Sequence, residues 1–149
     1  MIAKSALVPW VEASPAEAAA LFRESLDRFD AVRFRVTGAC MLPVLAPGEV
    51  VRLRAAARAR PRFGDVLLFS TRDGPRLHRL VWRPPFACWR TRGDLAPGFD
   101  GPLDPRSALG TVIGVERDEA LVPVFSRTRA VVSLVRGILL RMRRAWTRP

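Results

Sequence analysis

Lysine is almost missing from this sequence of 149 residues. It occurs only as Lys4, so 24 of the 25 basic residues are arginine, and against 14 acidic residues the formal net charge is +11 at pH 7. A positive charge of this size is compatible with a nucleic acid or an anionic membrane as partner. Because the arginines are spread along the whole chain, a plain compositional preference for arginine over lysine explains the charge equally well. The charge by itself therefore assigns no partner.

Long apolar runs are also missing. No run reaches the roughly 18 residues of a membrane-spanning helix, and the N-terminus lacks the basic-then-apolar order of a secretory signal. The hydrophobic fraction of 49% and the charged fraction of 26% are ordinary for a globular protein, and a chain of this length fits one domain. No internal repeat or low-complexity segment is present. We expect a single cytoplasmic domain without a transmembrane segment.

Cysteine and histidine are scarce: the sequence holds Cys40, Cys88 and a single histidine, His78. The two cysteines could form one disulfide, but the sequence does not give their distance and a domain of this size does not need the bond. We expect both to be reduced, with Cys88 packed in the core on a strand between Ala87 and Trp89. We expect no metal site and no cofactor.

The first element predicted from the residues present is a helix that begins after Ser14. Ser14 is suited to the N-cap, Pro15 to the first helical position and Glu17 to the third, which together form a helix-start signal. The predicted helix ends near Arg28. Its apolar stripe predicts that segment 1–30 packs on the domain rather than on a partner; the stripe consists of Ala18, Leu21, Phe22, Ser25, Leu26 and Phe29.

From Ala31 the hydrophobic period changes to two, which is typical of half-buried strands. A first strand is predicted to begin at Val32 and to end at Gly38, and Gly93 to Arg106 is predicted to form a long loop. The further strands are predicted at Val50 to Leu53, Val66 to Phe69, Leu77 to Trp82, Ala87 to Thr91 and Leu109 to Val115. These runs predict a mainly β domain over residues 31–117.

The segment 118–149 is predicted to contain a basic amphipathic helix from Val131 to Trp146. At 100° per residue, its apolar residues fall within an arc of about 140°, and they are Leu134, Val135, Ile138, Leu139, Met142, Ala145 and Trp146. Two interpretations remain open. The helix lies on an anionic membrane surface as a peripheral contact, or it docks through this stripe on its own domain and leaves its arginines in solvent.

The most specific motif lies between the first and second predicted strands, in the segment from Thr37 to Val51. It contains Gly38, then Cys40-Met41, then Pro43, and then Gly48-Glu49 ahead of an apolar strand. This order resembles the nucleophile box of the peptidase superfamily that contains signal peptidase I and the self-cleaving SOS-type repressors. Three later segments match that superfamily in the same order: Pro61 to Phe69, Leu77 to Val81, and Thr91 to Asp94 with Asp100 beyond.

The resemblance implies a compact signal-peptidase-like (LexA-like) β-fold and a catalytic role for Cys40 and His78. The superfamily nucleophile is a serine, and its base is a lysine or, in the archaeal and endoplasmic-reticulum branch, a histidine. Because no lysine follows Lys4, the pair His78-Arg79 matches the histidine branch. Cys40 takes the serine position, and a thiol paired with an imidazole is a competent nucleophile.

Further roles follow from the same resemblance. In the histidine branch an aspartate six residues after the Gly-Asp box orients the base, which selects Asp100, with Asp94 as a supporting or alternative member. Met41 and Pro43 are expected to contact the substrate. Arg79 is expected to pair with a carboxylate near the site. Glu49 and Asp65 are interpreted as turn residues without a chemical role.

The resulting hypothesis is an endopeptidase that processes a leader-like or signal-like segment of a peptide or protein after small residues. A second hypothesis is an inactive relative that keeps a peptide-binding groove for a regulatory role, since the exchange of serine for cysteine can mark lost turnover. Nucleic-acid binding is the least favoured, because one recognisable helix before Val32 cannot form a helix-turn-helix domain.

Overall fold

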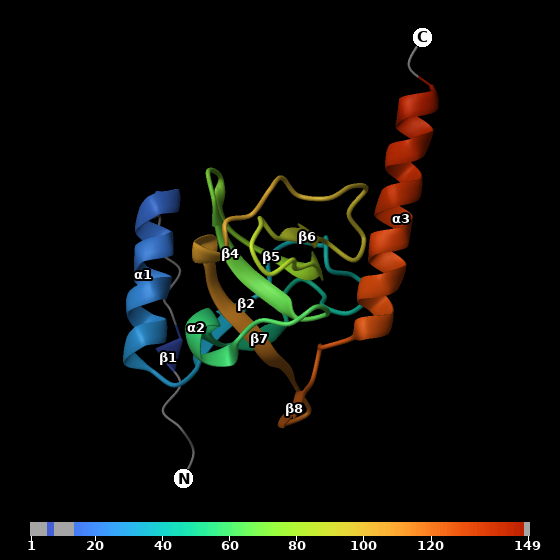
Figure 1. Cartoon of the computed structure of the whole chain (residues 1–149). Helices are drawn as coiled ribbons and strands as arrows, with labels where there is room; N and C mark the ends of the chain where they lie inside the picture. Colours follow the sequence, from blue (N-terminus) through green and yellow to red (C-terminus); the bar gives the residue numbers. More distant parts are fainter. Residues whose placement is uncertain (1–5, 8–13, 148–149) are drawn as a thin grey trace.

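The computed structural model describes residues 6–7 and 14–147, which form an eight-stranded sheet with a helix toward each end of the chain. The elements in chain order are β1 (Ala6–Leu7), α1 (Pro15–Arg28), β2 (Val32–Arg35), β3 (Val50–Ala55), α2 (Ala56–Ala59), β4 (Val66–Thr71), β5 (Gly74–Trp82), β6 (Arg90–Arg92), a 3-10 turn (Pro105–Ser107), β7 (Ala108–Arg117), β8 (Ala120–Val122) and α3 (Arg127–Trp146). The prediction of a mainly β protein with a helix on each side is confirmed (Figure 1).

The sheet has the order β1-β2-β3-β7-β4-β5-β6, with β8 paired to β7. Every pair is antiparallel except β1–β2. The insertion of β7 between β3 and β4 joins the first part of the domain to the later hairpin β4–β5. The loop after β2 carries Cys40, strand β5 carries His78, and the loop after β6 carries Asp94 and Asp100.

Helix α1 starts as the sequence predicts. The Ser14 side chain accepts a hydrogen bond from the Glu17 backbone N–H, and the Glu17 carboxylate accepts one from the Ser14 N–H at 2.8 Å. The helix buries Phe22 and Leu26 against the sheet, so its stripe packs on the domain as expected, although Leu21 is 39% exposed.

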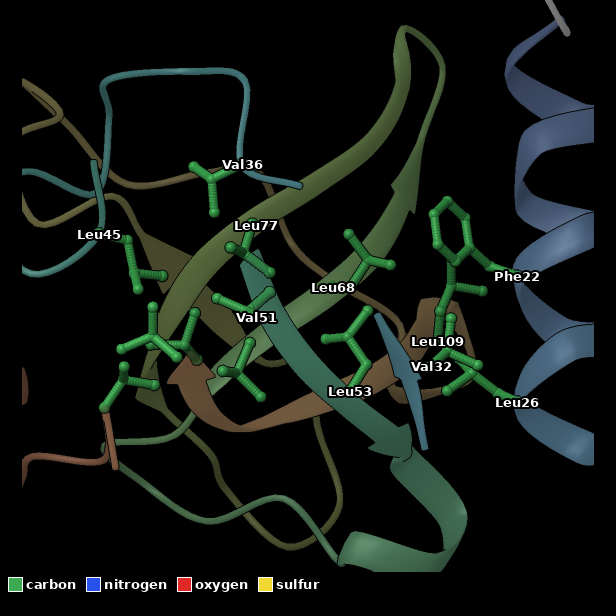
Figure 2. Close-up of a cluster of buried hydrophobic side chains, with 14 of the residues drawn as sticks. Phe22, Leu26, Val32, Val36, Leu45, Val51, Leu53, Leu68, Leu77 and Leu109 are labelled. Atoms are coloured by element: carbon green, nitrogen blue, oxygen red, sulfur yellow. The ribbon is translucent and has the colours of Figure 1, made fainter. Parts of the chain in front are cut away.

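The main hydrophobic core lies between α1, the sheet and the loop that follows β2 (Figure 2). The labelled side chains come from α1, from strands β2, β3, β4, β5 and β7, and from the β2–β3 loop: Phe22, Leu26, Val32, Val36, Leu45, Val51, Leu53, Leu68, Leu77 and Leu109. Leu45 is fully buried, so the loop that carries Cys40 is fastened into the core. A second, smaller cluster around Leu67, Phe69 and Leu80 fills the other face of the β4–β5 hairpin.

Two strand predictions need correction. The predicted strand from Ala87 to Thr91 is wrong over its first half: β6 comprises Arg90–Arg92, preceded by a single bridge between Trp89 and Leu103. Cys88 is therefore exposed in a loop and not part of the core. The sheet also continues beyond residue 117, because β8 turns back onto β7 through Asp118 and Glu119, which adopt positive φ angles of 47° and 64°.

Helix α3 begins at Arg127, four residues earlier than predicted, with the Ser126 side chain as N-cap. It leans on the domain with its first half and extends past it (Figure 1). The buried residues are Ala130, Ser133 and Gly137. Helix α3 docks on its own domain, in line with one of the two interpretations, but small residues form the contact and most of the apolar stripe is exposed. Among the described residues, no helix combines the length and apolarity needed to cross a membrane.

Candidate functional site

Cys40 opens a tight turn that starts five residues after β2 ends. The turn is closed by hydrogen bonds from the Leu42 N–H to the Ala39 carbonyl, 3.1 Å, and from the Leu45 N–H to the Met41 carbonyl, 3.0 Å. Met41 and Leu45 are 1% and 0% exposed, so the residues after Cys40 anchor the turn in the core. The Cys40 side chain is only partly buried. A partly accessible thiol is thus held on a fixed backbone.

His78 lies in the middle of β5, paired with Leu67 of β4. It is 6% exposed, and its ring meets Phe69 edge-on with the centroids 6.1 Å apart. The Cys40 and His78 side chains are close enough to shift each other's pKa, and the Sγ atom of Cys40 lies 4.0 Å from the carbonyl oxygen of Leu77, the neighbour of His78. The structure therefore brings together the two residues on which the peptidase hypothesis depends.

Asp100 completes the arrangement on the other side of the imidazole. Nδ1 of His78 lies 2.6 Å from Oδ2 of Asp100. The same Oδ2 accepts a hydrogen bond from the Thr91 hydroxyl at 2.6 Å, and Arg76 lies 3.4 Å from Oδ1. The Asp100 backbone N–H donates to the Thr91 carbonyl at 2.9 Å. Because Nδ1 is occupied by Asp100, Nε2 is the ring nitrogen left for the thiol.

These contacts shift the pKa values of all three residues. The hydrogen bond with His78 lowers the pKa of the Cys40 thiol, and it outweighs the opposing effect of burial. Burial works against a charged His78, yet the hydrogen bonds with Asp100 and Cys40 raise its pKa to about 9. Burial also opposes ionisation of Asp100, but the hydrogen bond with His78 leaves its pKa below the ordinary value. Both the lowered pKa of Cys40 and the raised pKa of His78 act in the direction of a thiolate–imidazolium pair.

Asp94 does not contact His78 and serves a different partner. Its carboxylate receives two hydrogen bonds from Arg79, with Nε to Oδ1 at 2.8 Å and Nη2 to Oδ2 at 2.7 Å. Arg79 is 0% exposed, and its Nη1 donates to the carbonyls of Gly64 and Val124 at 2.8 and 3.0 Å. Arg79 thus pairs with a carboxylate as expected, while Asp94 is a framework residue and not an alternative orienter of the base.

Neighbouring residues of a strand point to opposite faces of the sheet. On β5 this alternation places His78, which contacts Asp100, and Arg79, which pairs with Asp94, on opposite faces. His78 shares its face with Leu80, whose partner on β6 is Thr91. Arg79 shares the other face with its own partner, Arg92. One face of the β5–β6 ladder therefore holds the imidazole and the hydroxyl that position Asp100. The opposite face holds two buried arginines that fasten the loop after β6.

Gly93 is a site residue whose role the sequence did not reveal. A β-carbon at position 93 would lie 2.7 Å from the Cys40 carbonyl oxygen and 3.0 Å from Nε2 of His78. The Leu95 N–H donates to the same Cys40 carbonyl at 2.8 Å. The loop after β6 thus passes directly over the Cys40–His78 contact, and only glycine permits this approach.

The two residues expected to bind substrate differ. Pro43 is exposed in the turn after Cys40, where a substrate can reach it. Met41 is buried in the main core, so the expectation that its side chain touches substrate is wrong. The Met41 side chain points into the main core and anchors the turn directly after Cys40. The interpretation of Glu49 and Asp65 as turn residues is confirmed, since their carboxylates accept from the backbone N–H groups of Ala46 and Arg62.

Chemically, the arrangement combines an accessible thiol, a shielded imidazole and a carboxylate, which suits nucleophilic attack on an electrophilic carbon followed by proton transfer. Among residues 6–7 and 14–147 no cluster of three or more histidine, cysteine or acidic side chains is arranged to hold a metal ion. In comparisons with known proteins, no family model, no curated protein and no solved structure matches the chain. Its function is therefore inferred from the geometry of the site.

Proposed function

We propose that the protein is an endopeptidase with Cys40 as nucleophile, His78 as acid and base, and Asp100 as the residue that orients His78. The observation that carries the proposal is that Asp100 holds Nδ1 of the buried His78 at 2.6 Å, while a β-carbon at position 93 would meet both Nε2 of His78 and the carbonyl of Cys40. The resemblance of the Cys40 turn and the His78-Arg79 pair to the signal peptidase superfamily supports the same assignment. A reducing compartment such as the cytoplasm would keep the thiol available.

In the proposed reaction, the Cys40 thiolate attacks the carbonyl carbon of the scissile peptide bond. The backbone N–H of Cys40 stabilises the oxyanion that forms. Protonated His78 gives its proton to the leaving amine, the C–N bond breaks, and a thioester forms on Cys40. A water molecule then transfers a proton to neutral His78 as it attacks the thioester, which releases the carboxylic acid and returns the thiolate.

The shifted pKa values favour this sequence. The lowered pKa of Cys40 favours the thiolate as nucleophile, and the raised pKa of His78 favours the imidazolium that protonates the leaving amine. Asp100 bonds Nδ1 and so keeps Nε2 toward the thiol. Thr91 and Arg76 hold Asp100 from two further directions. Asp100 is therefore held by two side chains besides His78, which keeps the imidazole in a fixed orientation during proton transfer.

The proposal is tested with a peptide library that contains small residues at the cleavage position, with products identified by mass spectrometry. The wild-type protein should release defined fragments, and Cys40→Ala should release none. Cys88→Ala is the matched control, because Cys88 is an exposed cysteine outside the site, and this variant should cleave like the wild type.

Absence of cleavage by the wild type over the whole library, together with binding of the same peptides, would contradict the proposal. That result would identify the protein as a peptide-binding module without turnover. Trapping of a thioester on Cys40 with one library peptide would establish the nucleophile directly. The mass of the adduct identifies which side of the bond remains on the protein.

A further inference from the structure

The outer face of α3 is the largest exposed apolar feature on a helix of this protein. We define it as the side chains that point away from the domain, each between 45% and 95% exposed: Val131, Val132, Val135, Ile138, Leu139, Met142 and Trp146. Within the described part of the chain nothing covers them. Single exposed apolar residues are common, but seven on one helical face call for a partner.

This face lies opposite the side that docks on the domain. At 100° per residue the seven side chains occupy an arc of about 120°, centred roughly 165° from the mean direction of Ala130, Ser133 and Gly137. The docked side is fixed by specific contacts: Arg92 donates to the Ser133 hydroxyl at 2.9 Å and to its carbonyl at 3.2 Å, and Gly137 faces the ring of Phe99. The domain therefore holds α3 by one side and presents the other outward.

Arginines border the outer face along both edges. On the same wheel, Arg129, Arg136 and Arg143 follow one edge, and Arg127 and Arg141 follow the other. No acidic residue occurs in α3 or anywhere after Glu119. The surface is thus an apolar strip between two rows of positive charge, with Trp146 near its end at 95% exposure.

We infer that α3 lies in the plane of an anionic lipid bilayer surface, with the outer face in the acyl boundary and the arginines on the headgroup phosphates. An amphipathic helix with arginines beside its apolar face binds such surfaces through both apolar burial and charge attraction. Long arginine side chains reach from the helix to the headgroups, and tryptophan favours the same interface. The helix lies on the bilayer and does not cross it.

The distribution of charge argues against a second copy of this chain and against a nucleic acid as the partner of the outer face. A second copy packed through the same face would bring two sets of unneutralised arginines together, since the helix offers no acidic partner. A nucleic acid would satisfy the arginines but would leave the apolar strip between them without a partner. A bilayer with anionic headgroups satisfies both parts of the surface at once.

The test is co-sedimentation of the full chain with large unilamellar vesicles of phosphatidylcholine, with and without about 30% phosphatidylglycerol. The protein should bind the anionic vesicles, bind the neutral ones at least tenfold more weakly, and lose affinity as salt rises. Leu139→Asp with Met142→Asp should reduce binding more than tenfold, because both side chains are exposed and neither supports the fold. Leu21→Asp, at an exposed apolar position on α1, is the matched control and should bind like the wild type.

A second pair of variants separates the bordering arginines from net charge. Arg129→Gln with Arg143→Gln should weaken binding to anionic vesicles roughly 25-fold, at about fivefold for each arginine. Arg28→Gln with Arg72→Gln removes the same charge from exposed positions away from α3 and should change binding less than twofold.

Three results would overturn the inference. The first is equal binding by the wild type and the Leu139→Asp, Met142→Asp variant. The second is a dimer that forms through α3 at micromolar concentration and is lost in that variant. The third is salt-steep binding to DNA or RNA that exceeds binding to anionic vesicles at the same ionic strength. None of these measurements depends on peptidase activity. The membrane inference and the proposed function are therefore tested independently of each other.

Discussion

The backbone of Gly93 passes so close to His78 that a β-carbon at position 93 would lie 3.0 Å from Nε2, the nitrogen that faces the thiol. The same β-carbon would lie 2.7 Å from the Cys40 carbonyl oxygen. The backbone of Gly93 therefore lies directly against both Cys40 and His78, at a position where a side chain has no room. Any side chain there must push Cys40 and His78 apart or displace the loop that carries Asp100.

Gly93→Ala should lower kcat/KM about 100-fold, because a displacement of about 1 Å between reacting groups has an effect of that size. Where no substrate is in hand, the rate of Cys40 alkylation at pH 6 should fall roughly tenfold or more. Gly98→Ala in the same loop is the matched control, since a β-carbon at position 98 would meet nothing within 4 Å. An equal decrease of kcat/KM in Gly93→Ala and Gly98→Ala would show a general effect on the loop. It would contradict a specific role of Gly93 in the packing of Cys40 against His78.

Asp100→Asn should reduce kcat/KM by a factor of about 10² to 10⁴, as expected when the group that orients a catalytic imidazole is neutralised. The folded protein should keep its melting temperature within a few degrees, because the amide can still accept the Thr91 hydroxyl. Asp27→Asn, at an exposed position of α1, controls for the loss of one negative charge. Unchanged kcat/KM in Asp100→Asn would remove Asp100 from the mechanism.

The pH profile of kcat/KM should be bell-shaped. Activity rises as the Cys40 thiolate forms, below the ordinary thiol pKa of about 8.5. It falls through a pH of about 9, where His78 loses the proton that the leaving amine needs. Asp100→Asn removes a contact that raises the pKa of His78, so the alkaline limb should move to lower pH. An alkaline limb that stays in place in this variant would speak against the His78–Asp100 contact.

The Arg79–Asp94 pair should matter for stability rather than chemistry. Asp94→Asn leaves the fully buried Arg79 without its anionic partner and should lower the free energy of unfolding by about 3 kcal/mol, measured by urea denaturation. The Arg54–Asp30 pair is the contrast, because its side chains are 40% and 63% exposed and 3.6 Å apart. Asp30→Asn should change the free energy of unfolding by less than about 1 kcal/mol. Similar losses in both variants would contradict the framework role of Arg79.

The elements that the sequence predicts well are those whose signals are local. Ser14, Pro15 and Glu17 specify the start of α1 within four residues, and alternation specifies most strands. Cys88 lies in a loop and not in the predicted strand, because a single bridge between Trp89 and Leu103 replaces the expected ladder. The docking side of α3 could not be predicted, because it depends on Phe99 and Arg92, which are distant in the sequence from Gly137 and Ser133.

The candidate site likewise contains residues that the sequence predicts and residues that only the folded structure brings together. Cys40, His78 and Asp100 could be selected from four motifs in a fixed order and from the lack of any lysine after Lys4. Thr91 and Arg76 could not, because their contacts with Asp100 join positions 9 and 24 residues apart and arise only when β5, β6 and the following loop assemble. Gly93 lies inside the motif from Thr91 to Asp94, but its close approach to Cys40 and His78 is a property of the folded chain.

The proposed mechanism requires Cys40 and His78 to form a thiolate–imidazolium pair. The most direct test is the pH dependence of Cys40 alkylation by iodoacetamide, followed by peptide mapping in a Cys88→Ser background. The wild-type rate should remain high at pH 6, where a free cysteine with a pKa of about 8.5 is almost entirely protonated. In His78→Ala the rate at pH 6 should fall about tenfold or more. A Cys40 rate that rises with an ordinary thiol pKa in both proteins would contradict the account.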